Sequence, residues 1–340
     1  MRRRPSRTAS VAATAAPRPW EAVDPAALRL GVSSCLLGQS VRYDGGHKRD
    51  SLLTDLLGPY VEWVPVCPEV ELGLGIPREP IRLVRRGDEV RLVAERSGTD
   101  HTAAMRRLAR RRVAELRSLD LSGYVFKKNS PSCGVERVRV HPEKPGPPRR
   151  EGRGLFAAVL MEALPLLPVE EEERLRDPGL RESFVERLFA YRRLQGLLRS
   201  RPSGARLAAF HTAHKLQLLA HAPAASRELG RLVAEAGRRP PAALLRRYAA
   251  AFMRALARPA SRRRHVNVLE HALGHLRGRL DPDSRAELRE LIHRYGEGEL
   301  PLVVPLTLLG HHVRRLGVET LAGQVYLEPH PRELALRNRV

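Results

Sequence analysis

The chain of 340 residues exceeds one typical domain and predicts two, and its three cysteines indicate a reducing, cytoplasmic location rather than a disulfide framework. Lys and Arg number 60 against 38 Asp and Glu, and the net charge of +22 favours a polyanionic partner such as nucleic acid. A general compositional bias toward Arg is the alternative. No run of 18 apolar residues occurs, so we expect no membrane-spanning helix and no membrane partner.

Residues 1–28 are rich in Arg, Ala and Pro and lack an apolar segment long enough for a secretory signal, so we expect a disordered basic tail. From residue 29 apolar runs alternate with helical patterns, which predicts an α/β domain with a Rossmann-like parallel sheet over 29–170. The predicted strands are 28–33, 61–66 and 123–126, and 82–84 with 90–94 form a predicted hairpin. The predicted helices are 51–57, 101–119 and 155–166.

The segment 140–153 is rich in Pro and Gly among charged residues, which predicts a mobile loop, and its length indicates a lid. An acidic run, 170–173, follows and leads toward the predicted domain boundary at Asp177. Residues 178–340 then show almost no strand signal, so we expect an all-α domain. Its predicted helices are 180–198, 205–219, 226–236, 242–257, 262–276, 283–295 and 302–316.

Cys35, Cys67 and Cys133 each follow a predicted strand. In an open parallel sheet the carboxyl ends of the strands border one crevice, so the three thiols could converge there. Thiolates are soft donors that suit zinc or iron–sulfur centres, and three protein ligands leave one metal position open. Three unrelated buried thiols are the alternative.

The sequence around these cysteines resembles the thiouracil desulfidase (TudS) family over roughly residues 29–167. The resemblance is carried by residues 34–38, 41–46, 67–69, 73–78 and 130–134. It implies a 4Fe-4S cluster held by Cys35, Cys67 and Cys133, with one iron free of protein ligands. The implied reaction is a non-redox, hydrolytic removal of sulfur that releases sulfide.

The second half is similar to the YbgA domain family. The similarity is carried by residues 210–215, 262–271, 304–309 and 324–331. Fused in this order, the two halves resemble bacterial tRNA 4-thiouridine desulfidases (RudS), which implies conversion of 4-thiouridine to uridine and a helical half that grips tRNA. The alternatives are a desulfidase of free thiouracil or another small thio base, a non-catalytic iron–sulfur protein that binds RNA, and a zinc hydrolase that acts on a nucleobase.

Three polar residues beside the cysteines are the predicted catalytic groups. Glu69 follows Cys67 by two residues and is the candidate general base, unless it pairs with a nearby arginine to hold its loop. Ser130 and Ser132 flank Pro131, and either hydroxyl could orient the base or the water. Hydrogen bonds that form the turn are the alternative role for both serines.

Basic side chains of the helical half are the predicted RNA contacts, with solvated faces or local ion pairs as the alternative. They are Lys215, Arg246, Arg247, Arg262, Arg263, Arg264, Arg314 and Arg315. A 4-thiouridine inside folded tRNA must be flipped out of its stack, and such contacts would supply the required energy. Nothing in the sequence indicates a protein partner.

Overall fold

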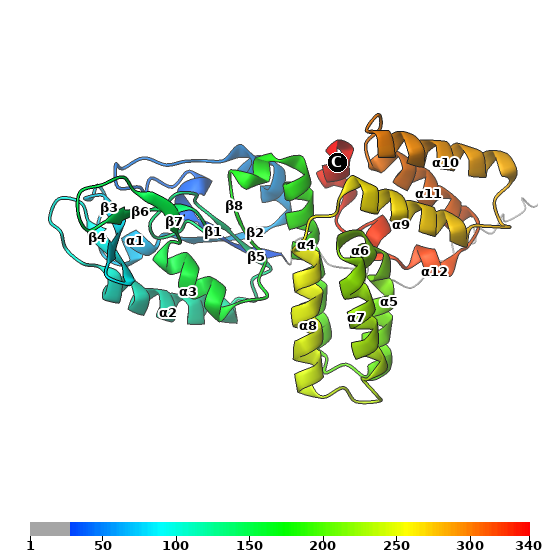
Figure 1. Ribbon diagram of the computed structural model, residues 1–340, viewed down its shortest axis with the longest axis horizontal. Helices are drawn as coiled ribbons and strands as arrows, with labels where there is room; N and C mark the ends of the chain where they lie inside the picture. The colour runs from blue at the N-terminus through cyan, green and yellow to red at the C-terminus, as the bar shows by residue number, and fades with distance from the viewer. Residues whose placement is uncertain (1–27) are drawn as a thin grey trace, which may run out of the picture.

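The computed structural model describes residues 28–340, so the predicted basic tail lies outside the described residues except for Leu28. Figure 1 shows a part built around strands and, beside it, a part built of helices. The fold class is therefore confirmed: an α/β region comes first, and helices follow from residue 178 onward. None of the described helices combines the length and the apolarity needed to cross a bilayer.

A wholly parallel sheet with the strand order β2-β1-β5-β8 forms the centre of the first part. Its strands are β1 (Arg29–Ser33), β2 (Glu62–Val66), β5 (Gly123–Phe126) and β8 (Val169–Glu171). β5 is buried along its whole length, as expected for a strand covered on both faces. The sequence predicts the first three strands but not β8, which lies in the acidic run and extends one residue beyond the predicted domain end at 170.

A second sheet has the strand order β4-β3-β6-β7. Its strands are β3 (Ile81–Arg86), β4 (Glu89–Ala94), β6 (Val138–Pro142) and β7 (Arg149–Gly152). The predicted hairpin is confirmed as β3 and β4. The predicted mobile lid over 140–153 is wrong, because β6 and β7 pair antiparallel through this segment. Val138 and Val140 are buried and Arg139 between them is exposed, an alternation that the neighbouring prolines obscure.

Short helical turns and two longer helices complete the α/β part. They are η2 (Ser34–Leu37), the π-helical η3 (Leu52–Leu57), η4 (Gly58–Tyr60), α1 (Pro68–Glu71), α2 (Thr102–Ser118), α3 (Leu155–Ala163) and η5 (Arg174–Arg176). α2 and α3 lie side by side against one face of the strands (Figure 1). Their apolar sides pack into one core with Tyr124 and Phe126 of β5.

The helical part contains nine α-helices and three 3₁₀ turns within the described residues. The α-helices are α4 (Pro178–Arg199), α5 (Gly204–Ala213), α6 (Lys215–His221), α7 (Pro223–Ala234), α8 (Ala242–Leu256), α9 (Arg262–His275), α10 (Pro282–Glu297), α11 (Val303–Arg315) and α12 (Glu319–Ala322). The 3₁₀ turns are η6 (Val325–Leu327), η7 (Arg332–Leu334) and η8 (Leu336–Arg339).

The predicted helix over 205–219 is interrupted at His214, where α5 ends and α6 begins. The amide of Gln324 bridges the break. It accepts a hydrogen bond from the N–H of Leu216 (3.1 Å) and donates one to the carbonyl of Thr212 (2.8 Å). Backbone groups that a continuous helix would pair are thus satisfied by a distant side chain.

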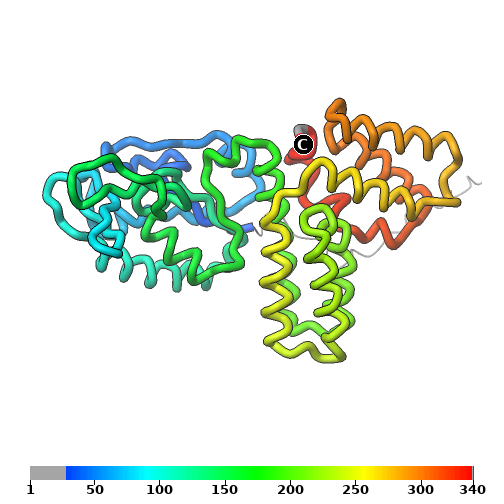
Figure 2. The backbone as a smooth tube through the Cα atoms, in the orientation of Figure 1, coloured from blue at the N-terminus to red at the C-terminus, as the bar shows by residue number. Residues whose placement is uncertain are grey.

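α4 belongs to both parts of the molecule. Leu188 packs in a core with Leu30 of β1, and Leu194 packs in the separate core of the helical part. The C-terminal segment, red in Figure 2, returns to this junction, where Leu334 and Leu336 join the same core as Leu188. The junction is therefore an apolar core rather than a flexible linker.

Buried charges lie beside α4 on the side of the returning C-terminal segment. Arg337 forms ion pairs with Glu182 (2.9 Å) and Glu186 (3.7 Å), and His221 bonds Glu186 at 3.0 Å. Burial opposes ionisation of Glu182, but Arg337 and His330 outweigh it and hold the pKa of that carboxyl below its usual range. Each charge depends on its partners, because an unpaired buried charge is costly.

Arg337→Met should lower the free energy of unfolding by about 3–5 kcal/mol, because it removes the buried guanidinium that Glu182 and Glu186 share. Urea unfolding followed by circular dichroism measures the change. Arg332→Met is the matched control, since Arg332 pairs with Glu328 at the surface and its loss should cost less than about 1 kcal/mol. Equal effects of the two substitutions would contradict the assignment.

Candidate active site

The three cysteines lie at the carboxyl ends of neighbouring parallel strands. Cys35 lies in η2 directly after β1, Cys67 follows β2 at the start of α1, and Cys133 lies in the loop after β5. All three line one cavity of about 590 Å³. The structure thus brings together the thiols that are separated in sequence, at the edge of the sheet where ligands of such folds bind.

The protein environment favours the neutral form of these thiols. Burial raises the pKa of Cys35 to about 11, with Lys127 acting in the opposite direction. Burial also raises the pKa of Cys67 and places that of Cys133 well above its ordinary value. Because thiolates are the metal-binding form, a metal centre here would form with release of protons.

The three cysteines contribute to the lining of one cavity. Within residues 28–340, no three His, Cys, Asp or Glu side chains converge closely enough to hold one metal ion. A single zinc ion requires ligands at about 2.0–2.3 Å from one centre, whereas a polynuclear iron–sulfur cluster is held by several separate thiolates. Three soft thiols facing one cavity fit the second kind of centre.

The loop that carries Cys133 is fixed by hydrogen bonds from both sides. The Ser130 hydroxyl accepts from the backbone N–H of Ser132 (3.2 Å) and of Cys133 (3.1 Å). The N–H of Phe156, in the first turn of α3, donates to the carbonyl of Ser132 (3.0 Å). A helix start has free N–H groups, and here they hold the cysteine loop. Ser130 thus has the turn-forming contacts of its alternative role.

Two residues of the acidic run 170–173 also bind the loop that carries Cys133. The Glu171 carboxylate accepts a hydrogen bond from the N–H of Val135 (2.7 Å). The Glu172 carboxylate accepts one from the N–H of Lys128 (2.8 Å) and pairs with the ammonium of Lys127. These carboxylates lie at the end of β8, next to β5, and the sequence reveals their role only once this strand pairing is known.

Glu69 is held in place by three hydrogen bonds. Its Oε2 accepts from Nη2 (2.7 Å) and Nε (3.1 Å) of Arg78, and its Oε1 accepts from the Ser132 hydroxyl (3.0 Å). The Arg78 side chain is 4% exposed and that of Glu69 is 14% exposed, and both residues line the cysteine cavity. Ser132 therefore has the predicted geometry for orienting the carboxylate.

Three further residues at the cavity were not singled out from the sequence. The Ser33 hydroxyl accepts a hydrogen bond from the N–H of Lys127 (3.0 Å), and Ser33 opposes the rise that burial causes in the pKa of the Cys133 thiol. Lys48 and Arg139 line the cavity, and in the part of the chain that the structure describes neither forms an ion pair. Ser33, Lys48 and Arg139 belong to no sequence pattern that would have identified them as residues of the site.

The eight predicted RNA contacts fall into two groups. Four basic side chains have partners within the protein: Arg262 bonds the carbonyl of Tyr295, Arg264 that of His221, Arg314 pairs with Glu328 and Arg315 with Asp281. The other four are exposed and have no ion pair within residues 28–340: Lys215, Arg246, Arg247 and Arg263.

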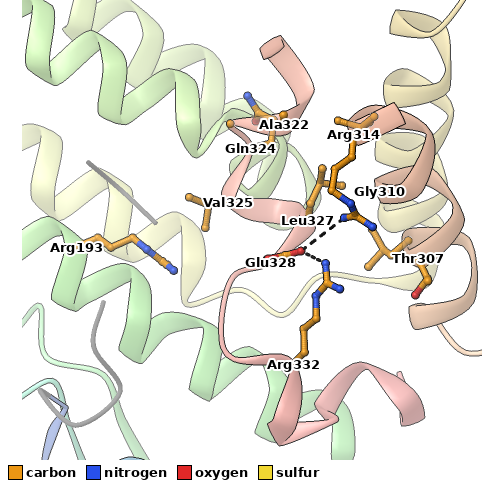
Figure 3. Close-up of a pocket in the computed structure, with 13 residues that line it drawn as sticks. Arg193, Thr307, Gly310, Arg314, Ala322, Gln324, Val325, Leu327, Glu328 and Arg332 are labelled. Carbon is orange, nitrogen blue, oxygen red and sulfur yellow. Dashed lines mark ion pairs between the residues drawn. The ribbon is translucent and has the colours of Figure 1, made fainter. Parts of the chain in front are cut away.

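Arg314 borders a second cavity, of about 350 Å³, in the helical part. Figure 3 shows that Arg314 and Arg332 both point toward Glu328, which balances part of their charge. This cavity contains no cysteine. All eight predicted basic contacts lie in the helical part, whereas the predicted reactive groups all lie in the α/β part.

A parallel sheet whose strand ends carry three thiols around one cavity defines an α/β protein with a cysteine-lined site. The family described as 2-thiouracil desulfurase matches residues 30–172, and the family described as a protein of unknown function (DUF1722) matches residues 215–331.

Individual relatives match each half. The uncharacterized protein YbgA of Escherichia coli (strain K12) is 33% identical over 158 residues, covering 46% of this chain and 94% of YbgA. The uncharacterized protein YbbK of Bacillus subtilis (strain 168) is 33% identical over 108 residues, covering 30% of this chain and 71% of YbbK. A solved structure described as a 4Fe-4S-dependent thiouracil desulfidase, TudS, shares 34% identity and covers 46% of this chain and 98% of its own, with a TM-score of 0.38.

The chain belongs to the 2-thiouracil desulfurase family through its α/β part and to the family of YbgA through its helical part. This combination is the one that the sequence motifs predict.

Gly154→Ala should destabilise the protein by about 1–3 kcal/mol, because a Cβ at Gly154 would lie 2.4 Å from the backbone carbon of Ser132. Urea unfolding measures this change. The matched control is Gly196→Ala within α4, where a Cβ meets no atom within 4 Å and should stabilise the helix by up to about 1 kcal/mol. A neutral Gly154→Ala would show that the Cys133 loop is not closely packed against α3.

Proposed function

We propose that the protein is a cytoplasmic tRNA 4-thiouridine desulfidase, an iron–sulfur enzyme that converts 4-thiouridine to uridine and releases sulfide. The observation that carries the proposal is the single cavity shared by three thiols and the Glu69 carboxylate. Cys35, Cys67 and Cys133 would hold a 4Fe-4S cluster. The match to the 2-thiouracil desulfurase family supports the reaction class.

The proposed reaction is hydrolytic. The thio base and water give the oxo base and hydrogen sulfide, so no electrons are transferred overall. When bound, a cluster with one open iron would supply a soft Lewis acid for the thiocarbonyl sulfur. The residues of the chain must position the thiolated nucleobase, deliver the attacking water and accept a proton from that water.

Glu69 is the group best placed to accept that proton. A carboxylate offers about four hydrogen-bonding positions, and Arg78 and Ser132 occupy three of them. One position therefore remains for a water molecule at the cavity. Because the three bonds fix the orientation of the carboxylate, the water would be held in a defined direction.

Two features support RNA as the carrier of the thio base. Lys48 and Arg139 place positive charge without an ion-pair partner at the cavity, where a nucleotide phosphate could bind. Lys215, Arg246, Arg247 and Arg263 give the helical part exposed cations that are available to phosphates. Free thiouracil has no phosphate, so its binding would need neither group of basic residues.

Desulfidation of free thiouracil is the second candidate, because the family description refers to that base. Anaerobically reconstituted protein is incubated with tRNA that contains 4-thiouridine and, separately, with free 2-thiouracil, and the sulfide released is measured. The proposal expects faster release from tRNA at equal concentrations of thio base. Release from the free base alone would show that free thiouracil, rather than tRNA, is the substrate. Release from neither would contradict the proposed desulfidase activity.

Glu69→Gln should lower the rate of sulfide release by about 10²- to 10⁴-fold, because the amide cannot accept the proton of water. Iron content and visible absorbance of the reconstituted protein should stay at the wild-type level. Glu71→Gln is the matched control: Glu71 lies two residues further along α1, pairs with Arg112 (3.4 Å) and is not among the residues that line the cavity. Normal turnover by the Glu69→Gln variant would contradict the assignment of Glu69 as the general base.

Replacing Lys215, Arg246, Arg247 and Arg263 by Gln should weaken tRNA binding and its dependence on salt. If each cation contacts one phosphate, the slope of log affinity against log salt becomes shallower by roughly 3. Filter binding over a range of salt concentrations measures the slope. The control variant replaces Arg199 and Arg294, exposed arginines that pair with Asp120 and Glu299, and should keep the wild-type slope.

A further inference from the structure

Exposed large apolar side chains occur at one place in the described chain. Within residues 28–340 only Tyr43 and Ile76 belong to this class, with 43% and 44% of their surface exposed. Tyr43 lines the cysteine cavity, and Ile76 lies two residues before Arg78, which lines it as well. The N–H of Arg78 donates to the carbonyl of Tyr43 (2.9 Å), so the two segments are joined at the mouth of this cavity.

The loop that carries Tyr43 is rigid. The N–H of Gly45 donates to the carbonyl of Arg42 (3.0 Å), and the N–H of Gly46 donates to the Asp44 carboxylate (3.0 Å). Asp44 also accepts two hydrogen bonds from the Arg42 guanidinium, each at 3.3 Å. That guanidinium lies over the Tyr43 ring, 5.3 Å from its centre. The ring is thus supported by a cation whose own position is fixed.

We propose that Tyr43 is the surface on which the thiolated uracil ring of the substrate stacks, with Ile76 as a neighbouring apolar contact. This inference rests on the proposed function and names a positioning residue for it. Enzymes that act on a base removed from its stack hold that base between aromatic and apolar side chains. An aromatic ring and an aliphatic side chain at the mouth of a cavity lined by thiols supply such contacts for a planar base.

The rigidity of the loop explains why such a contact would be effective. A tyrosine has two side-chain torsions, and one that is already supported loses little entropy when a ligand binds. Stacking also makes few demands on the ring substituents, because every base presents a π face. Tyr43 would therefore fix the plane of the ring, while the thiols and Glu69 act on the thiocarbonyl carbon and sulfur.

The test compares Tyr43→Ala, Tyr43→Leu and Tyr43→Phe in the reconstituted full-length protein, with 4-thiouridine-containing tRNA and with free 2-thiouracil. Tyr43→Ala should raise KM by roughly 5- to 100-fold for both substrates and leave kcat nearly unchanged, because stacking acts equally on substrate and transition state. Tyr43→Phe should restore the wild-type KM, whereas Tyr43→Leu keeps apolar bulk without a π face and should not. Iron content should be the same in all variants.

Each outcome decides the inference. An unchanged KM in Tyr43→Ala overturns it, and so does full rescue by Tyr43→Leu. A defect confined to tRNA also overturns it, because Tyr43 would then contact a neighbouring nucleotide rather than the reacting base.

Failure of the proposed function has a different signature, which is a wild-type protein that releases no sulfide from either substrate. Equilibrium dialysis of free 2-thiouracil then tests stacking without turnover. Weaker binding to Tyr43→Ala than to wild type supports the inference, and equal binding or none to either protein overturns it.

Discussion

The buried ion pair between Arg78 and Glu69 connects all three cysteine loops. Glu69 follows Cys67 and accepts a hydrogen bond from Ser132, the residue before Cys133. Arg78 holds Glu69 through its guanidinium and, through its backbone N–H, holds Tyr43 in the loop that follows Cys35. Since removing one member of a buried pair leaves the other charge without compensation, the loops depend on one another. The parallel strands bring the three thiols to one edge of the sheet, and this pair links the segments that carry them.

The two roles considered for Glu69 are therefore compatible. The carboxylate is bound to an arginine, as a purely structural residue would be, and it also borders the cavity with one hydrogen-bonding position free. A base that is already oriented needs no rearrangement when water binds, so the structural contacts prepare the proposed chemical one. The same reasoning applies to Ser132, whose hydroxyl serves the carboxylate, whereas Ser130 serves the backbone of the loop.

The sequence predicts those features that depend on local patterns. The apolar runs of β1, β2 and β5 and the position of each cysteine after a strand follow directly from composition and order. Features that depend on distant partners were missed. β8 ends in the acidic run, and Glu171 and Glu172 at its end bind the Cys133 loop, which no local pattern reveals. The hairpin of β6 and β7 resembles a loop in sequence, because its exposed face is charged and its turn is rich in proline.

The helical part shows a further limit of motif-based prediction. Many of the residues that carry its resemblance to the YbgA family build its interior. His265 bonds the Tyr326 hydroxyl (2.8 Å), Gln324 closes the break between α5 and α6, and burial lowers the pKa of His214 to about 3 and keeps it neutral. Of the four exposed cations proposed to meet RNA, Lys215 and Arg263 lie within these motifs, whereas Arg246 and Arg247 lie outside them. Family membership thus accounts for much of how the helical part folds, and the proposed RNA binding must be argued from its surface charge, of which the motifs contain only a part.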